Sequence, residues 1–417
     1  MKNLLILGLG ETGKSVLAYC HTRHLPAIGF DTRSHLSDFE KIKADYGFPC
    51  YLETLPVSAW KGISEVIASP GLDLELPLLK DARARGINII GDIELFYREA
   101  KAPIIAITGT NAKSTVTSLV TEMINAAGKK ALMGGNIGIP ALQLLDAPVP
   151  DYYVLELSSF QLELTQNFRA FVGVVLNISP DHLDRHHTME AYTAAKMRIY
   201  KNCPHPILMG RDGASSYPCL IQSQDLSPGL SGLHNLENAR NALAITAPLN
   251  LPLAPQLEVL RTFKGLPHRC VVVADIHGVK WVNDSKGTNV GATLAAINGL
   301  GPDAKEGLIL LLGGLAKNQD FTPLREVIAQ YVKETIVFGQ DRALILKDLK
   351  GLPTHEMGTD FKAVLEYAAT QAKPGSIVLL SPACASQDLF KDYNDRGDQF
   401  RDWVLEHFVI PATVGIQ

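Results

Sequence analysis

A loop rich in hydroxyl residues, with one glycine and one lysine, is the clearest candidate for chemistry. Residues 108–115 read Thr-Gly-Thr-Asn-Ala-Lys-Ser-Thr, after an apolar run at 104–107 and before a helical pattern. In that context backbone amides can surround phosphate groups, with Lys113 on the outer phosphate and a hydroxyl on Mg²⁺. Ile107 and Ala112 replace two glycines of the common pattern. The loop alone therefore leaves an ordinary strand-to-helix turn open as the alternative.

Further polar residues follow the next apolar runs. Glu156 lies at the end of the run 153–157, where a carboxylate beside a phosphate loop can hold Mg²⁺ directly or through water. The run Asp-His-Leu-Asp-Arg-His at 181–186 fits Mg²⁺, zinc or a solvated polar loop. Lys196 lies in a helical pattern and looks like an ordinary surface lysine.

The amino-terminal segment has the spacing of a dinucleotide fingerprint. Gly8, Gly10 and Gly13 follow an apolar run and open a helical pattern, and Asp31 lies 18 residues after Gly13. These glycines allow a tight turn and bring helix amides close to a pyrophosphate. The pattern supports a nicotinamide cofactor and any other diphosphate equally, and a glycine turn without a ligand stays open. Residues 69–71 can face the same crevice.

The last third of the chain repeats the arrangement of polar residues after buried strands. Asp284 can accept ribose hydroxyls and Lys286 can neutralise a transferring phosphoryl group, although the segment also fits a hairpin exit. The runs 312–317 and 380–386 place small residues and one polar side chain after apolar strands, as in ligand sites of doubly wound sheets. Cys384 fits a packed small residue better than a nucleophile.

Short β-branched or leucine-rich runs alternate with helix-length amphipathic segments, which predicts buried parallel strands in βαβ units. The length of 417 residues corresponds to about three domains at about 150 residues each. Breaks near 91–92 and 264–267 give domains 1–91, 92–265 and 266–417. The expected strands are 4–7, 65–69, 87–90, 104–108, 153–157, 173–177, 271–275, 308–312, 335–338 and 377–380, with a short strand at 281–282.

Composition narrows the class of protein. Hydrophobic residues make up 46% and charged residues 20% of the chain, as in ordinary globular domains. The formal net charge of −4 gives no basic footprint for nucleic acid. The six cysteines form no Cys-x-x-Cys pair, which favours a reducing cytosol. We expect neither a signal peptide nor a membrane span, and hence a soluble cytoplasmic protein.

Together these motifs resemble one family over essentially the whole chain, the Mur ligases of peptidoglycan synthesis, and within it the ligases that add D-glutamate. The run Asp-Ser-Lys-Gly-Thr-Asn at 284–289 separates the chain from sister ligases that add L-alanine or a diamino acid. Further matching segments are 31–33, 91–96, 134–138, 155–163, 194–200, 234–235, 265–269 and 381–386. The resemblance implies a Rossmann-like amino-terminal domain, a central phosphate-loop domain that binds ATP, and a Rossmann-like carboxy-terminal domain.

The resemblance also implies a reaction. ATP phosphorylates the carboxylate of UDP-N-acetylmuramoyl-L-alanine, and the amine of D-glutamate attacks the acyl phosphate. Two Mg²⁺ ions and lysines carry the charge, and Lys196 matches a lysine that CO₂ converts into a carbamate with oxygen ligands for Mg²⁺. The implied setting is cytoplasmic peptidoglycan synthesis, and thereby cell wall biogenesis, cell shape and cell division. We expect a monomer whose partners are these three substrates.

Family roles transfer residue by residue. The catalytic group is Lys113, Glu156, His182, Lys196 and Lys286. The metal ligands are Ser114, Glu156, His182 and Lys196 as a carbamate. ATP is assigned to Gly109, Thr110, Asn111, Ala112, Lys113, Ser114, Thr115, Asn235, Asn238, Arg269 and Asp284. The UDP substrate is assigned to Thr12, Asp31, Thr32, Arg33, Ser69, Gly71 and Asn136. D-Glutamate is assigned to Lys286, Thr288, Lys317, Ser386 and Tyr393.

Two departures from the family pattern affect these assignments. Tyr393 stands where the family usually has phenylalanine. Ala112 replaces a loop glycine, and its methyl group is strained if the position needs positive φ, so Ala112→Gly should keep or improve use of ATP. The alternatives are an NAD-dependent oxidoreductase built on the first domain and a nucleotide-binding regulator impaired at Ala112.

Overall fold

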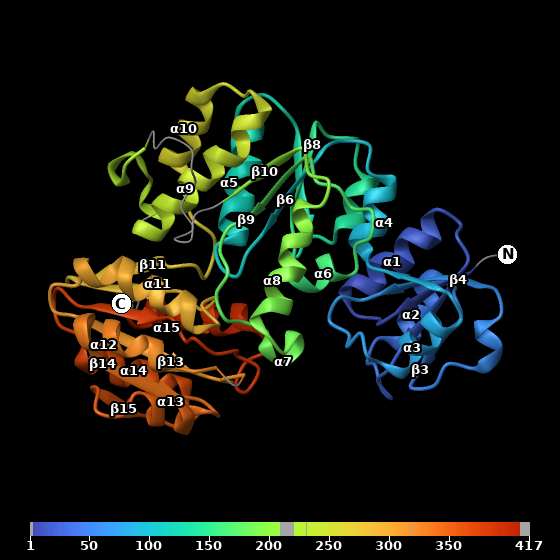
Figure 1. Ribbon diagram of the computed structural model, residues 1–417. Coiled ribbons are helices and arrows are strands. Elements are labelled where there is room, and N and C mark those ends of the chain that lie inside the picture. Colours follow the sequence, from blue (N-terminus) through green and yellow to red (C-terminus); the bar gives the residue numbers. More distant parts are fainter. Residues whose placement is uncertain (1–2, 209–220, 231, 318, 409–417) are drawn as a thin grey trace, which may run out of the picture. The chain divides into compact units, whose positions relative to one another are not determined.

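The chain forms three α/β sheets in sequence order (Figure 1). The computed structural model describes residues 3–208, 221–230, 232–317 and 319–408. By its internal contacts the chain divides into two compact units. The first unit takes Met1–Ile178, Arg185–Pro218 and Ala239–Val259, and the second takes Ser179–Asp184, Cys219–Asn238 and Leu260–Gln417. The three sheets, with helices between their strands, confirm the predicted α/β class.

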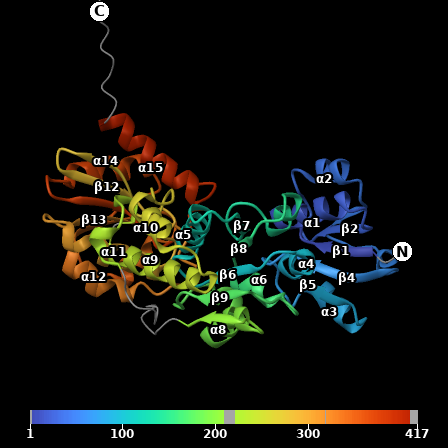
Figure 2. The same cartoon turned by 90° about the horizontal axis from the view of Figure 1, so that it is seen from above.

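The first sheet is entirely parallel and covered by helices on both faces (Figure 2). Alternation along β1 explains the two faces, because Ile6 packs with the cluster of α1 and α2 whereas Leu5 and Leu7 pack with that of α3. In sheet order the strands are β3 (Cys50–Leu52), β2 (Ala27–Asp31), β1 (Asn3–Leu7), β4 (Ile63–Ala68) and β5 (Asn88–Ile90). The helices are α1 (Glu11–Thr22), α2 (Phe39–Tyr46), α3 (Pro77–Ala84) and the 3₁₀ turn η1 (Val57–Trp60).

The second sheet is also parallel and has its phosphate-loop strand in the centre. In sheet order the strands are β10 (His205–Ile207), β9 (Val172–Val175), β6 (Ile104–Thr108), β8 (Tyr152–Glu156) and β7 (Ala131–Gly135). The helices are α4 (Asp92–Glu99), α5 (Lys113–Ala126), α6 (Ser159–Glu163), α7 (Leu183–His186) and α8 (Met189–Met197), with 3₁₀ turns η2 (Ala141–Asp146) and η3 (Arg198–Tyr200).

Buried Glu94 anchors α4 beside this sheet. Its side chain is fully buried and accepts hydrogen bonds from the backbone N–H groups of Gln166, Asn167 and Phe168 at 2.8–3.1 Å. Several donors around one carboxylate satisfy a buried charge that would otherwise be costly. The segment that joins the first two sheets is therefore held to the loop before β9.

The segment between the second and third sheets is helical where it is described. It contains η4 (Ser223–Asp225), η5 (Pro228–Leu230), α9 (Leu233–Thr246), η6 (Ala247–Leu249) and α10 (Leu253–Thr262).

The third sheet is mixed. In sheet order its strands are β11 (Val271–Ile276), β12 (Val279–Asn283), β16 (Ile377–Leu380), β13 (Leu308–Gly313), β14 (Val332–Phe338) and β15 (Thr354–Glu356), and only β11 is antiparallel to its neighbour. Leu310 and Leu312 pack with α11 (Val290–Leu300), α12 (Arg325–Tyr331) and α13 (Arg342–Asp348) on one face. Ile309 and Leu311 pack with α14 (Phe361–Gln371) and α15 (Tyr393–Phe408) on the other (Figure 2). The remaining turns are η7 (Gly301–Asp303) and η8 (Thr322–Leu324).

All the strands predicted from sequence overlap observed strands. The prediction that all strands are parallel is wrong for β11. This strand is antiparallel to β12, to which the tight turn at His277 and Gly278 connects it. Five strands were not predicted, namely β2, β3, β7, β10 and β15. Most of these are short edge strands, whose few residues give little periodicity. No helix within the described residues is long and apolar enough to span a membrane.

Candidate active site

The phosphate loop, residues 108–115, joins β6 to α5 in the first unit. Ala112 has φ 67° and ψ −7° and occupies the N-cap position of α5, so the positive φ that the missing glycine suggested is present. The Lys113 side chain folds back over the loop and donates to the carbonyl oxygens of Gly109 at 2.9 Å and Thr110 at 2.8 Å. The loop and the helix amino terminus together provide backbone N–H groups for an anion.

Three polar side chains meet beside this loop, from the first turn of α5 and from the ends of the neighbouring strands β8 and β7. Ser114 Oγ donates to Glu156 Oε2 at 2.5 Å, and Asn136 Nδ2 donates to Glu156 Oε1 at 2.7 Å. Glu156 is 2% exposed. The main chain approaches just as closely, because a Cβ atom at Gly135, which has φ 100°, would lie 2.4 Å from the Glu156 carbonyl oxygen. Glu156 is thus held at a fixed place next to the loop.

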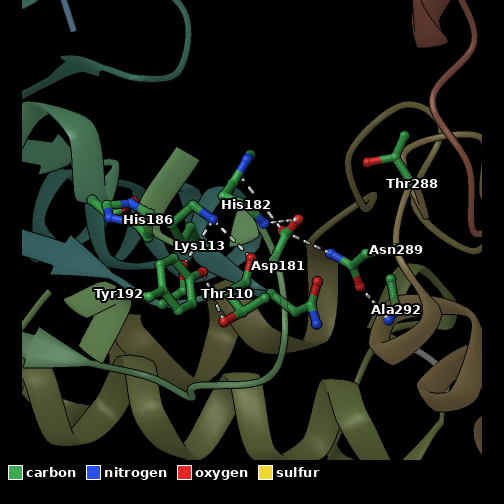
Figure 3. Close-up of polar contacts among 12 residues, drawn as sticks. Thr110, Lys113, Asp181, His182, His186, Tyr192, Thr288, Asn289 and Ala292 are labelled. Carbon is green, nitrogen blue, oxygen red and sulfur yellow. Dashed lines mark hydrogen bonds and ion pairs between the residues drawn. The ribbon is translucent and has the colours of Figure 1, made fainter. Parts of the chain in front are cut away.

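Lys196 lies against the phosphate loop from α8. Its side chain is 2% exposed, and Nζ donates to the Gly109 carbonyl oxygen at 2.8 Å. Nζ also lies 4.6 Å from the ring centroid of Tyr192, whose hydroxyl is 3.0 Å from Thr110 Oγ1 (Figure 3). Sequence reasoning gave Tyr192 no role, and periodicity alone did not distinguish Lys196 from a surface lysine. The structure shows a buried lysine that shares one carbonyl oxygen with Lys113.

His182 belongs to the second unit. It has φ 54°, and its backbone N–H donates to Asp181 Oδ1 at 3.0 Å. Asp181 Oδ2 accepts from Asn289 Nδ2 at 3.2 Å, and Asn289 is in turn the N-cap of α11, accepting from the Ala292 N–H (Figure 3). The predicted metal ligand is therefore tied by Asp181 to the segment after β12, a link that sequence spacing did not reveal.

The residues assigned to the nucleoside are also in the second unit. Asn235 and Asn238 are each 7% exposed, and Asn238 Nδ2 donates to Asn235 Oδ1 at 3.0 Å. Asp284 accepts from Ser381 Oγ at 2.7 Å and from the Cys270 N–H at 3.3 Å. Burial raises the pKa of the Asp284 carboxyl to about 6, although the hydrogen bond from Ser381 and the charge of Arg269 each lower it.

The residues assigned to D-glutamate follow three adjacent strands of the third sheet. Lys286 and Thr288 follow β12, Lys317 follows β13, and Ser386 follows β16. These positions are at the carboxyl ends of parallel strands, where open α/β sheets bind ligands. Tyr393 begins α15, and Lys286 Nζ lies 3.7 Å from the centroid of its ring.

Arg396 is a buried residue that sequence reasoning missed. It is 0% exposed and donates to Ser285 Oγ at 2.9 Å, to the Ser285 carbonyl oxygen at 2.8 Å and to the Cys384 carbonyl oxygen at 3.2 Å. Burial lowers the pKa of the guanidinium to about 10, which leaves it charged at neutral pH. One charged side chain on α15 thus holds the loops after β12 and β16, although its helical spacing resembles that of any surface arginine.

The glycine motif of the first sheet forms a tight turn around Asp31. Asp31 Oδ2 accepts from the Leu9 N–H at 2.8 Å, and both carboxylate oxygens accept from the Arg33 guanidinium at 2.7–2.8 Å. Burial opposes ionisation, but Arg33 and the backbone donors outweigh it and lower the pKa of Asp31 to about 2. Ser69 Oγ donates to the Gly8 carbonyl oxygen at 3.0 Å. Of the other residues assigned to UDP, Thr12 lies in the first turn of α1, and Thr32 and Gly71 follow β2 and β4.

The donor set beside the phosphate loop fits Mg²⁺. Mg²⁺ prefers oxygen ligands, keeps several waters and takes one or two carboxylates together with substrate phosphates. Glu156 and Ser114 provide a carboxylate and a hydroxyl at one place. No cluster of three or more His, Cys, Asp or Glu residues suited to a metal occurs in the described part of the chain.

Comparisons with known proteins agree over nearly the whole chain. Family models match at residues 2–91 (Mur ligase MurD-like, N-terminal domain), 107–225 (Mur ligase middle domain) and 268–384 (Mur ligase, glutamate ligase domain). The chain is 42% identical to a UDP-N-acetylmuramoylalanine–D-glutamate ligase of Legionella pneumophila, covering 95% of this chain and 97% of the relative. It is 41% identical to the ligase of the same name from Marinobacter nauticus, covering 97% of this chain and 98% of the relative.

Solved structures show the same fold. The UDP-N-acetylmuramate–alanine ligase of Thermotoga maritima has a TM-score of 0.59 at 17% identity, covering 97% of this chain and all of the other. The MurF ligase of the same organism, in complex with ADP, has a TM-score of 0.61 at 15% identity, covering 91% and 95%. At these identities the likeness concerns the fold alone, whereas the full-length relatives establish the family. The chain belongs to the Mur ligase family, among the UDP-N-acetylmuramoylalanine–D-glutamate ligases.

Proposed function

We propose that the chain is an ATP-dependent ligase that joins D-glutamate to UDP-N-acetylmuramoyl-L-alanine in peptidoglycan synthesis. Identity of about 40% to ligases of this activity over 95% of the chain supports the substrates. The structural observation that carries the chemistry is the contact of Ser114 with Glu156 beside the phosphate loop. This contact supports the proposal because a hydroxyl and a carboxylate next to a phosphate loop are the groups that hold Mg²⁺ beside a nucleotide phosphate.

The reaction needs activation because a carboxylate is a poor electrophile. A carboxylate oxygen of UDP-N-acetylmuramoyl-L-alanine attacks the γ-phosphorus of ATP, the bond from that phosphorus to the bridging oxygen breaks, and ADP leaves. The neutral amine of D-glutamate then attacks the acyl carbon and loses a proton. The bond from that carbon to the phosphate oxygen breaks, so that an amide forms and phosphate leaves.

We assign the charge developed on the phosphates to Lys113 and to the backbone N–H groups of the phosphate loop. These groups are held in place before reaction, which is how electrostatic stabilisation lowers a barrier. Mg²⁺, when bound at Ser114 and Glu156, supplies positive charge to the phosphate oxygens. We further propose that two Mg²⁺ ions bind and that His182, and Lys196 as a carbamate, are metal ligands. Catalytic roles are proposed for Lys113, Glu156, His182, Lys196 and Lys286.

Carbamylation of Lys196 is proposed from its burial against the loop. The reaction requires the neutral amine to attack CO₂, and the carbamate would replace an ammonium with oxygen ligands for Mg²⁺. A ¹³C carbamate signal after incubation with ¹³C-bicarbonate, present in the wild type and missing in Lys196→Arg, tests this assignment.

The remaining substrate groups are assigned to the two units separately. The turn at Gly8 with Asp31, Arg33 and Ser69 is assigned to UDP, together with Thr12, Thr32, Gly71 and Asn136. Asn235, Asn238, Arg269 and Asp284 are assigned to the nucleoside of ATP, and Lys286, Thr288, Lys317, Ser386 and Tyr393 to D-glutamate, where two lysines suit two carboxylates. We further propose domains 1–91, 92–265 and 266–417, in a monomer that works in the cytoplasm.

Phosphate release tests the proposal. Purified protein with Mg²⁺-ATP and UDP-N-acetylmuramoyl-L-alanine should release phosphate on addition of D-glutamate and not of L-glutamate. Phosphate release that does not depend on D-glutamate, or no phosphate release, would contradict the proposed function. Addition of NADH is the control for the oxidoreductase alternative, and we expect no change in its absorbance.

A further inference from the structure

The side-chain amide of Gln319 joins three backbone segments of the second unit. Its Oε1 accepts from the Val290 N–H at 3.0 Å, and Nε2 donates to the carbonyl oxygens of Ala316 and Ala383, both at 3.1 Å. A longer contact of 3.5 Å reaches the Thr288 carbonyl oxygen. An N–H can only donate and a carbonyl can only accept, so these partners fix which end of the amide is the oxygen.

The three segments are those that carry the proposed D-glutamate residues. Thr288 lies two residues before Val290, Lys317 follows Ala316, and Ser386 lies three residues after Ala383. Each segment leaves a different strand of the third sheet, so their spacing is not set by any one strand. Arg396 bonds the segments after β12 and β16, and a backbone bridge between Leu315 and Ala385 joins those after β13 and β16. The Gln319 amide bonds all three segments at once.

Two residues in these segments have a positive φ, a backbone conformation that residues other than glycine rarely adopt. Lys317 has φ 51° and Ala383 has φ 55°. Such conformations persist only where surrounding contacts hold them. The Gln319 amide bonds the carbonyl oxygen of Ala383 and that of Ala316, directly before Lys317, and the Gln319 backbone N–H donates to the Ala316 carbonyl oxygen at 3.0 Å.

We propose that Gln319 is a positioning residue for D-glutamate, which holds Thr288, Lys317 and the Ser386 loop at the spacing the amino acid requires. This inference rests on the proposed function. Because the Gln319 amide bonds the backbone of the segments that carry these residues, its loss should weaken binding of D-glutamate and leave the phosphate loop in the first unit unaffected.

The test compares Gln319→Glu and Gln319→Leu with the wild type. The glutamate variant keeps the shape and the acceptor for Val290, but places a carboxylate oxygen about 3 Å from two carbonyl oxygens, where no hydrogen bond forms. We expect the KM for D-glutamate to rise at least tenfold in both variants. The KM values for ATP and for the UDP substrate, and kcat at saturating D-glutamate, should stay within about threefold. Gln330→Glu, on an exposed part of α12, is the matched control.

Hydrogen exchange provides a readout independent of turnover. Faster exchange at Gln319 and Ala385 in Gln319→Glu, with α5 unchanged, would support the positioning role. An unchanged KM for D-glutamate in the variants overturns the inference even when the wild type is an active ligase. Equal rises in the KM values for ATP and D-glutamate overturn it too, since they indicate general damage. A wild type that ignores D-glutamate overturns the proposed function and this assignment together.

Discussion

Ser114 and Glu156 join the start of α5 to the end of β8 through one hydrogen bond of 2.5 Å. The bond connects a residue of the phosphate loop to a carboxylate that is 2% exposed. A buried carboxylate with hydrogen-bonded oxygens keeps a fixed position. The pair is therefore suited to receive a cation together with a nucleotide phosphate without rearrangement of the sheet.

Glu156→Gln should lower kcat about 100-fold or more and raise the Mg²⁺ concentration needed for half-maximal activity. The amide keeps the shape and an acceptor for Asn136 but removes the negative charge, and 100-fold corresponds to about 2.7 kcal/mol of transition-state stabilisation. Phosphate release measured across a Mg²⁺ titration checks it. Glu122→Gln, an exposed position on α5, is the control. Unchanged Mg²⁺ dependence in Glu156→Gln would remove Glu156 from the metal site.

Ala112→Gly should leave the KM for ATP unchanged or lower and leave stability equal or slightly higher. An alanine held at φ 67° destabilises the folded state by about 1–2 kcal/mol. Glycine removes this strain, but its greater freedom in the unfolded chain lowers the free energy of unfolding by about 0.4–1 kcal/mol. The net gain is thus about 0–1.6 kcal/mol.

Ala127→Gly is the matched control for this change. Ala127 is the C-cap of the same helix and has φ −80°, so glycine there relieves nothing and should lower the melting temperature. If Ala112→Gly destabilises as much as Ala127→Gly, or raises the KM for ATP severalfold, the positive φ at 112 is not a source of strain.

The sequence predicts strand-end residues well because buried strands leave a strong apolar signal. Glu156 and Asp284 both follow such runs, and the structure places both at carboxyl ends of sheet strands. Lys196 and Arg396 lie on helices, where a buried cation has the same spacing as a surface one. Their burial depends on loops distant in the chain, Gly109 for Lys196 and Ser285 for Arg396. Pairings of this kind are set by tertiary packing and leave no local pattern.

Asp92→Asn should make stability less dependent on pH. Burial raises the pKa of Asp92 to about 6, against about 3.9 in an unfolded chain. A raised carboxyl pKa gives stability that is fully present below about pH 4 and is lost as the pH rises through 6, by about 3 kcal/mol for two pKa units. The asparagine never ionises, and its oxygen can still accept from Gln161, which donates to Asp92 at 3.4 Å.

Melting temperatures of wild type and Asp92→Asn at pH 5 and pH 7.5 check this expectation. The difference, variant minus wild type, should be more positive at pH 7.5 than at pH 5. Exposed Asp303→Asn should show the same difference at both values. An equal difference for Asp92→Asn at the two pH values would mean that Asp92 does not take up a proton on folding in this range.

Tyr393→Phe should retain nearly full activity, whereas Tyr393→Leu should lower kcat/KM for D-glutamate about 2- to 30-fold. Lys286 Nζ lies 3.7 Å from the ring centroid, and a cation over an aromatic face gains about 0.5–2 kcal/mol. Phenylalanine keeps that face and leucine removes it, so the pair isolates the ring from the hydroxyl. Steady-state kinetics with varied D-glutamate measure the effect. An equal loss in both variants would instead assign the contribution to the hydroxyl, since that group is then the only feature both variants lack.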